Sequence, residues 1–347
     1  MWVTHLAFPN PGDGDRIPAG SRSPADGGSH CREAPTHGFL RGLECPEGWD
    51  ARRMGVPGFL LGLLREAPNR RRLIRSLALG NQGGDRRVTS ADGTSLSVRT
   101  SGSGTPLVLV HGILDGIGAF SLIELELAEQ YAVWVYDRRG RGGSGDAQDY
   151  AFEREVDDLR AVIAETGSTP HVLGHSFGGV VALQAALSGV EMRSLILYEP
   201  PLNGKAVTRD HVASIHRAIA EHRLDDAITT VTREFAGVSD DELHVAMQVP
   251  PVREHLREGV RTVPRELEAI RACDWGNLPL TDVPVLTIRG ARTGSSIYPT
   301  NEQAAALAID TEIEVLPDQD HLAHTFAPSV FAEVVLDYLD RRSRRAA

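Results

Sequence analysis

Several features are scarce in this 347-residue sequence, and each absence removes a class of protein. No apolar run approaches the roughly 20 residues that cross a bilayer; the run from Phe59 to Leu64 is far shorter. We therefore expect no membrane span. The three cysteines, Cys31, Cys45 and Cys273, show no CxxC spacing and cannot all pair. A disulfide-stapled fold and a zinc ribbon are both disfavoured, and a reducing compartment fits this cysteine usage.

A secretory signal, a net positive charge and metal-binding motifs are also missing. The first thirty residues lack the basic start and apolar stretch of a secretory signal, so a cytoplasmic protein is expected. The formal net charge is −11, which makes binding to nucleic acid phosphates an unfavourable interpretation. The thirteen histidines include no HExxH or similar spacing, and we expect no metal site. A small molecule is the expected partner, and the sequence does not indicate an oligomeric state.

The N-terminal part differs in composition from the rest. Residues 1–53 are rich in Gly, Pro, Ser and Asp without apolar periodicity, which is typical of a disordered or extraneous extension. Met54 is a candidate for the true start. Residues 54–85 form a separate segment with an amphipathic helical pattern broken by Pro68. We expect this segment to pack its apolar side on its own domain and to leave its arginines in water.

From residue 86 onward the pattern becomes that of an α/β protein. Alternating residues around Asp92 and Gly93 predict a β-hairpin. Short, continuously apolar strands then alternate with helical stretches, which indicates a mostly parallel sheet with helices on both faces. The predicted strands are residues 106–112, 132–137, 171–176, 193–199, 283–290 and 311–317.

One interval interrupts this alternation. Residues 201–276 contain helical patterns but no strand pattern. We therefore divide the folded part into a core, residues 86–200 and 277–342, and a helical insertion, residues 201–276. An insertion between two strands of such a sheet is well placed to act as a lid.

The stretch GHSFGG carries the clearest chemical signal. Ser176 follows a predicted buried strand and precedes a predicted helix, with Gly174 and Gly178 on either side. A G-x-S-x-G sequence in this context predicts a nucleophile elbow, a tight turn that exposes a reactive serine and leaves no room for bulky neighbours. The alternative is a glycine-rich turn with an incidental serine.

Residues 86–342 resemble the α/β-hydrolase family through four motifs in the order that the family has them. These are LVLVHGI, YDRRGRGGSG, the serine motif GHSFGG, and LPDQDHLAH near the C-terminus. The resemblance implies the α/β-hydrolase fold, a mostly parallel doubly wound sheet with a helical lid insertion. Dehalogenases and epoxide hydrolases of this fold carry aspartate at the nucleophile position, so Ser176 places the chain in the serine-nucleophile, esterase-like branch.

The same resemblance explains a possible dinucleotide motif. Gly140, Gly142 and Gly145 spell G-x-G-x-x-G, but the next helix is predicted to begin only near Phe152. A dinucleotide site requires a helix that opens within the glycines. The glycine-rich loop of the hydrolase family accounts for these residues, and no cofactor is expected.

The resemblance also assigns further site residues. His321, in the C-terminal motif, matches the catalytic base, and His324 is a competing candidate three residues later. The backbone N–H groups of Ile113 and Phe177 match the oxyanion hole, where fixed donors stabilise developing negative charge. Asp320 stands where the family usually has glycine.

The acid of the triad is missing from its usual place. The family supplies an aspartate three residues after the strand-ending glycine, but Thr293 occupies this position after Gly290 and no carboxylate follows until Glu302. Glu199, at the end of the strand that follows the serine motif, is the predicted replacement, as in some family members. The alternative is that Glu199 caps a turn before two prolines.

These observations favour a cofactor-independent serine hydrolase that cleaves an ester or related acyl bond of a small organic substrate. Ser176, His321 and Glu199 would form the triad, and an acyl-enzyme would be the intermediate. The displaced acid motivates an alternative: a non-hydrolytic protein of this fold, such as a lyase or cyclase of natural-product biosynthesis or a ligand receptor.

Overall fold

The structure is a computed structural model that describes residues 84–236, 238, 240–272, 280–294 and 296–346. The expected extension at residues 1–53, nearly all of the segment at 54–85 and the three cysteines lie outside the described residues.

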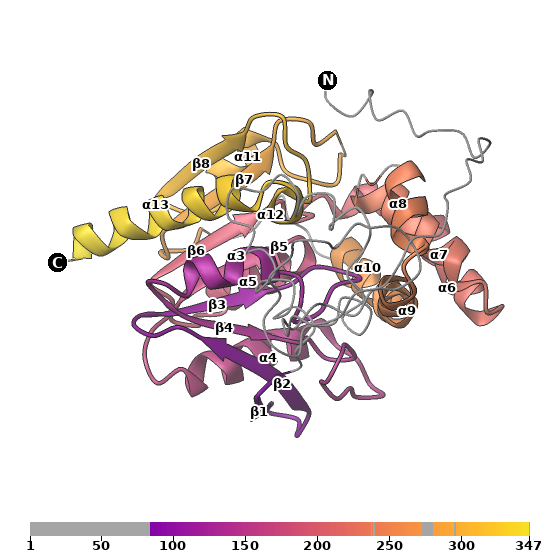
Figure 1. Cartoon of the computed structure of the whole chain (residues 1–347), viewed down its shortest axis with the longest axis horizontal. Helices are drawn as coiled ribbons and strands as arrows, with labels where there is room; N and C mark the ends of the chain where they lie inside the picture. Colours follow the sequence, from indigo (N-terminus) through magenta and orange to yellow (C-terminus); the bar gives the residue numbers. More distant parts are fainter. Residues whose placement is uncertain (1–83, 237, 239, 273–279, 295, 347) are drawn as a thin grey trace, which may run out of the picture. The chain divides into compact units, whose positions relative to one another are not determined.

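An eight-stranded sheet forms the centre of the described domain (Figure 1). Its strand order is β1-β2-β4-β3-β5-β6-β7-β8. Strands β1 and β2 pair antiparallel, as do β2 and β4, and every other neighbouring pair is parallel. The hairpin and mostly parallel sheet predicted from the sequence are therefore confirmed. The strands are β1 Arg86–Thr89, β2 Ser95–Ser101, β3 Pro106–Val110, β4 Ala132–Tyr136, β5 His171–His175, β6 Ser194–Tyr198, β7 Val285–Gly290 and β8 Thr311–Leu316.

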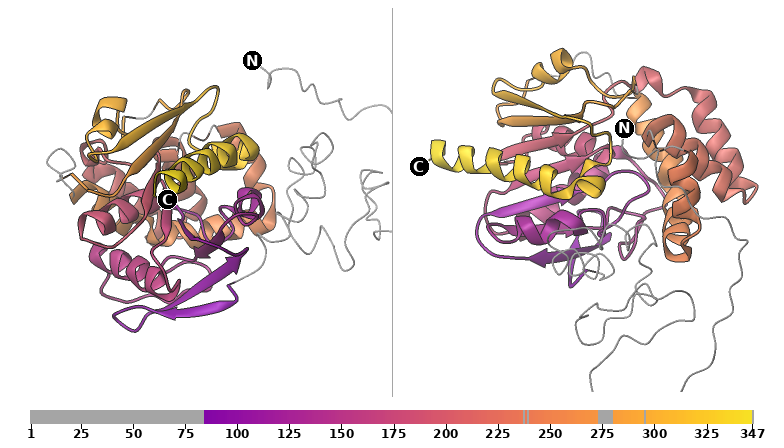
Figure 2. Two further views of the ribbon diagram at one scale, coloured as in Figure 1. Left: turned by 90° about the vertical axis from the view of Figure 1, so that its left-hand side faces the viewer. Right: turned by 45° about the horizontal axis from the view of Figure 1, so that its top comes forward.

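Both faces of the sheet are buried because successive strand residues point to opposite sides. In β3, Val108 and Val110 join one apolar cluster, whereas Leu107 and Leu109 join the other. Helices α4 and α5 pack on the first face, and α3, α12 and α13 pack on the second (Figure 2). Their bounds are α3 Ser121–Leu127, α4 Phe152–Glu165, α5 Phe177–Leu187, α12 Ala323–Phe326 and α13 Pro328–Ala346.

The elements that the structure describes between β6 and β7 are helices, joined by turns, and Thr281 forms an isolated β-bridge with Ala308. Figures 1 and 2 show these helices grouped beside one end of the sheet. No helix in the described ranges is both long and apolar enough to span a bilayer. The elements are η1 Gly204–Ala206, α6 Arg209–Ala220, α7 Leu224–Val231, the π-helical turn η2 Thr232–Ala236, α8 Asp240–Met247, α9 Pro250–Gly259, η3 Val260–Thr262 and α10 Val263–Ala272, and a short α11, Asn301–Ala305, follows β7.

The parallel strands β3, β5, β6 and β7 end at the same edge of the sheet. Ser176 directly follows β5, Glu199 follows β6, and Gly290 ends β7. Ligand sites of open α/β sheets lie at this carboxyl edge. The topology therefore brings together residues that are far apart in the sequence.

Candidate active site

Ser176 occupies a strained turn between β5 and α5. Its backbone angles are φ 52° and ψ −125°, a region that residues with a side chain rarely adopt. A Cβ atom on Gly178 would lie 2.2 Å from the carbonyl oxygen of Val110, and one on Gly174 would lie 2.6 Å from the carbonyl oxygen of Gly178. Only glycine fits at either position, which explains the G-x-S-x-G sequence in this turn.

The surrounding backbone holds the turn in place. The N–H of Ser176 donates to the carbonyl oxygen of Tyr198 at 2.9 Å, which extends the β5–β6 pairing by one residue. Phe177 is the first residue of α5, and N–H groups in the first turn of a helix have no carbonyl partner within that helix. Free donors and the positive end of the helix dipole therefore lie beside the serine.

Glu199 and His321 are in direct contact. The Oε2 atom of Glu199 lies 2.7 Å from Nδ1 of His321, the contact expected from the sequence. The other carboxylate oxygen accepts a hydrogen bond from the N–H of Gly290 at 2.7 Å. Glu199 is 2% exposed and has a positive φ of 45°, so its conformation is fixed by tertiary contacts rather than local preference.

The loop that carries His321 is held by hydrogen bonds on both sides. The hydroxyl of Tyr198 donates to the carbonyl oxygen of Asp320 and accepts from the N–H of Ala323. The carbonyl oxygen of His321 accepts a hydrogen bond from Nε2 of His175 at 3.0 Å. These contacts fix the backbone of His321 against the strand ends β5 and β6.

The loop after β3 is anchored by hydrogen bonds to the carbonyl oxygen of Gly112. The carbonyl oxygen of Gly112 accepts hydrogen bonds from Nδ1 of His111 at 2.9 Å and from Nη1 of Arg138 at 3.0 Å. In a trans peptide the N–H points opposite to the C=O. The N–H of Ile113 therefore points away from Arg138. A Cβ on Gly112 would lie 3.0 Å from Cβ of Ser176, so this loop passes close to the serine.

With this geometry established, comparison with protein families gives one match that covers most of the described domain. The model of the alpha/beta hydrolase family matches residues 107–334. The chain belongs to the alpha/beta hydrolase family.

Individual relatives of this member of the alpha/beta hydrolase family carry the names of hydrolytic enzymes. N-formylmaleamate deformylase from Pseudomonas putida is 34% identical over 150 residues, which is 42% of this chain and about half (52%) of that relative. The 2-(acetamidomethylene)succinate hydrolase of Mesorhizobium japonicum is 24% identical over 71% of this chain and 92% of its own. An alpha/beta hydrolase structure from Sphaerobacter thermophilus is 31% identical, with a TM-score of 0.65 over 73% of this chain and all of that one.

Beneath the loop after β3 lies a buried charge network that the sequence does not reveal. Arg138 forms ion pairs with Glu155 on α4 at 3.0 Å and with Glu266 on α10 at 2.6 Å. Glu266 also binds Arg141 at 2.8 Å. Burial alone would raise the pKa of Glu266, but Arg141 and Arg138 lower it to about 2. The carboxylate is thus ionised, and the network connects the inserted helices to the loop around Gly112.

The competing histidine has a different environment. His324 lies on α12, is 2% exposed and packs its ring against those of His175 and Phe120. Burial, with a contribution from the nearby His321, lowers the pKa of His324 to about 3. A histidine that stays neutral in this way is a poor proton acceptor at neutral pH. Of the two histidines, His321 is the one whose Nδ1 lies within hydrogen-bond distance of Glu199.

Proposed function

We propose that the protein is a cofactor-independent serine hydrolase that cleaves an ester or related acyl bond of a small organic substrate. The observation that carries the proposal is the contact between Glu199 and His321 at the same sheet edge as the strained Ser176. A buried carboxylate that accepts a hydrogen bond from Nδ1 leaves Nε2 of the imidazole as the available base.

In the proposed reaction, Ser176 Oγ attacks the acyl carbon while His321 removes its proton. The N–H groups of Ile113 and Phe177 stabilise the negative charge on the acyl oxygen. His321 then returns the proton to the leaving group, and an acyl-enzyme remains. Water attacks the acyl carbon in the second half, with His321 again as base, and Ser176 regains its proton. Glu199 stabilises the imidazolium formed in each half.

We propose that the helices between β6 and β7 act as the lid over this site. Two contacts support this role. Tyr298, whose ring centroid lies 4.7 Å from that of His321, donates its hydroxyl hydrogen to the carbonyl oxygen of Phe235 in η2. The second contact is between Gly259 of α9 and Leu114 in the loop after β3. The two backbones lie so close that a Cβ atom on Gly259 would be 3.1 Å from Leu114.

The proposed target, an ester or related acyl bond, follows from the type of nucleophile and agrees with the reactions that the relatives' names describe. A hydroxyl nucleophile with backbone donors for an oxyanion suits attack on a carbonyl carbon. The two relatives are named N-formylmaleamate deformylase and 2-(acetamidomethylene)succinate hydrolase, and both names describe hydrolytic reactions. The displaced acid motivates the non-hydrolytic alternative, and the contact between Glu199 and His321 supports the hydrolytic proposal over it.

A fluorophosphonate probe tests the proposal directly, because labelling requires an activated serine. We expect the wild-type protein to be labelled and to hydrolyse p-nitrophenyl acetate, and Ser176→Ala to lose both properties. Absence of labelling in a folded wild-type protein would refute the proposed nucleophile.

The role of Glu199 has its own test. Glu199→Gln should remain folded, because the amide occupies nearly the same volume, and should lose about a thousandfold or more in kcat. The amide can favour the wrong tautomer of His321 and cannot offset the imidazolium charge. Near-normal turnover would show that Glu199 is structural.

A further inference from the structure

A buried tyrosine outside the proposed triad packs on the pair formed by Glu199 and His321. Tyr298 lies in the loop between β7 and α11, and its ring centroid is 4.7 Å from that of His321, with an interplanar angle of 30°. The same side chain lines the small cavity beside Glu199. Burial, with a further contribution from Glu199, raises the pKa of the Tyr298 phenol well above its usual value. The phenol therefore stays neutral, and its ring keeps water from one side of the pair.

The hydroxyl of Tyr298 connects this ring to the inserted helices. It donates its hydrogen to the carbonyl oxygen of Phe235, which lies in the π-helical turn η2. Carbonyl groups in the last turn of a helix have no donor further along that helix, and the phenol supplies one. A buried phenol also needs a partner for its own hydrogen. The bond therefore satisfies one buried group on each side.

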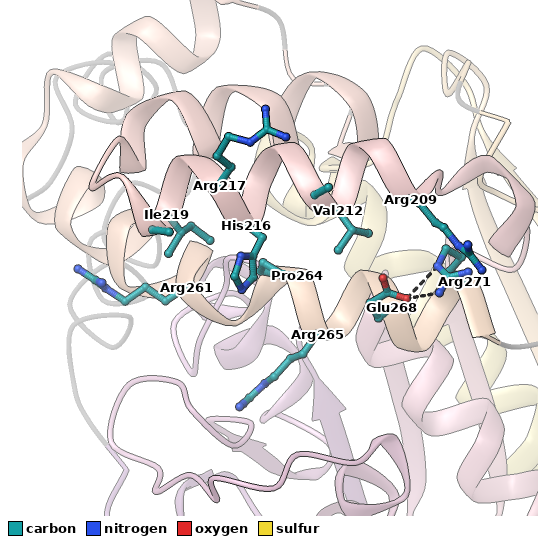
Figure 3. A pocket seen from close by; sticks show the side chains of 12 residues that line it. Arg209, Val212, His216, Arg217, Ile219, Arg261, Pro264, Arg265, Glu268 and Arg271 are labelled. Atoms are coloured by element: carbon teal, nitrogen blue, oxygen red, sulfur yellow. Dashed lines mark hydrogen bonds and ion pairs between the residues drawn. The ribbon is translucent and has the colours of Figure 1, made fainter.

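The turn η2 is part of a packed group of helices. It directly follows α7, which packs on α6, and α6 packs on α10. Figure 3 shows side chains of α6 and α10, Val212 and Pro264 among them, along the groove between these two helices. The loop of Tyr298 is also bound to the start of the insertion, because Asn203 donates hydrogen bonds to the carbonyl oxygens of residues 296 and 297. A displacement of the lid helices would therefore be felt at Tyr298.

We propose that Tyr298 is a positioning residue that couples the lid helices to His321. This inference rests on the proposed function, because it concerns the base of that reaction. While the bond to Phe235 is formed, the ring stays packed on the imidazole. Opposite charges attract more strongly where water is excluded, so Glu199 stabilises the imidazolium best in this state. Displacement of the lid helices would break the bond, release the ring and make Ser176 less reactive.

Tyr298→Phe tests this coupling, because phenylalanine keeps the ring on His321 and removes only the bond to η2. We expect the rate of fluorophosphonate labelling and kcat for p-nitrophenyl acetate to fall together by about tenfold. The matched control is Tyr136→Phe. It removes a buried hydroxyl on β4 that has no hydrogen-bond partner in the described part of the chain, and it should leave both rates unchanged.

A second measurement does not depend on hydrolysis. The Nδ1 proton of His321, assigned by its loss in His321→Gln, is followed by proton NMR, and its exchange with water reports how well the pair is covered. We expect this exchange to be at least about fivefold faster in Tyr298→Phe than in the wild type, because local opening becomes easier. Tyr136→Phe should exchange this proton at the wild-type rate.

The outcomes separate this inference from the proposed function. Equal labelling and equal proton exchange in Tyr298→Phe and the wild type would overturn the coupling and leave Ser176 as the proposed nucleophile. A lower melting temperature with both rates unchanged would also overturn it, since the tyrosine would then serve packing alone. If the wild type is not labelled, the proposed function fails, whereas faster proton exchange in Tyr298→Phe would still support the coupling to His321.

Discussion

Replacing Tyr198 by phenylalanine removes one hydroxyl that holds the loop of His321 from both sides. The hydroxyl donates to the carbonyl oxygen of Asp320 and accepts from the N–H of Ala323 at 2.9 Å. The ring itself packs against His175 at 5.0 Å between centroids and against Phe331 at 4.8 Å. Phenylalanine keeps these ring contacts, so the substitution isolates the hydrogen bonds.

The expected magnitude follows from the two groups that lose their partner. Tyr198 is fully buried, and a buried polar group left without a hydrogen bond costs about 1–3 kcal/mol. Two such groups give a loss of about 2–6 kcal/mol if neither finds a new partner. If half of this loss appears as misplacement of His321, kcat falls about 5- to 140-fold, since 1.4 kcal/mol corresponds to a factor of ten. We expect KM to change little.

The assay compares kcat and KM for p-nitrophenyl acetate at 25 °C with the melting temperature of each variant. Tyr136→Phe is a matched control, because the Tyr136 hydroxyl is buried on β4 and has no hydrogen-bond partner among the described residues. If the Tyr198 hydroxyl had only a structural role, Tyr198→Phe would lower the melting temperature but leave kcat close to that of the wild type. The reasoning is refuted if Tyr198→Phe retains kcat within twofold of the wild type.

Two further predictions concern stability. Glu266→Gln leaves Arg138 and Arg141 buried with one fewer carboxylate, which we expect to cost about 3 kcal/mol or more and to lower the melting temperature by several degrees in calorimetry. For His171, burial and the nearby Arg193 lower the pKa to about 4. Because the unfolded chain binds this proton more readily, stability should fall as pH decreases from about 6.5 toward 4, by up to about 3 kcal/mol. In His171→Asn the melting temperature should decrease less between pH 7 and pH 5 than it does in the wild type. The same decrease in both proteins would contradict this prediction.

The sheet could be predicted because its signals are local. Each strand is a short apolar run bounded by turn residues, and the predicted limits agree with the structure to within two residues. For example, the run 106–112 contains β3, Pro106–Val110. The dipeptide Asp92-Gly93 also predicted the hairpin turn between β1 and β2. In the structure Gly93 has the positive φ that glycine permits. Helix α3 follows the same rules but has too few residues for a periodic pattern.

The site was only partly accessible from the sequence. Ser176 is marked by its own glycines, and Glu199 by its position at the end of a parallel strand. The contact between Arg138 and Glu266 joins residues 128 positions apart. No local pattern distinguishes such a buried pair from ordinary surface charges. Tyr198 is hidden for another reason: in an apolar strand it resembles a core residue, and its hydroxyl matters only once the loop of His321 folds back onto it.

In the proposed site, the acid stands at the end of β6, whereas its usual family position follows β7. Glu199 and Thr293 both line a small cavity of about 20 Å³, near the volume of one water molecule. The Thr293 hydroxyl is buried and has no hydrogen-bond partner among the described residues. Aspartate has nearly the size of threonine, so Thr293→Asp should fit and bring a carboxylate to the usual family position.

In the Glu199→Gln background, Thr293→Asp should therefore restore about tenfold of the lost kcat, because a carboxylate near His321 again offsets the imidazolium charge. In the wild-type background the same substitution should lower kcat or stability, because two carboxylates then share one small buried space. Thr293→Asn is the neutral control. Equal turnover of the Asp and Asn variants in the Glu199→Gln background would show that a carboxylate at position 293 cannot replace Glu199.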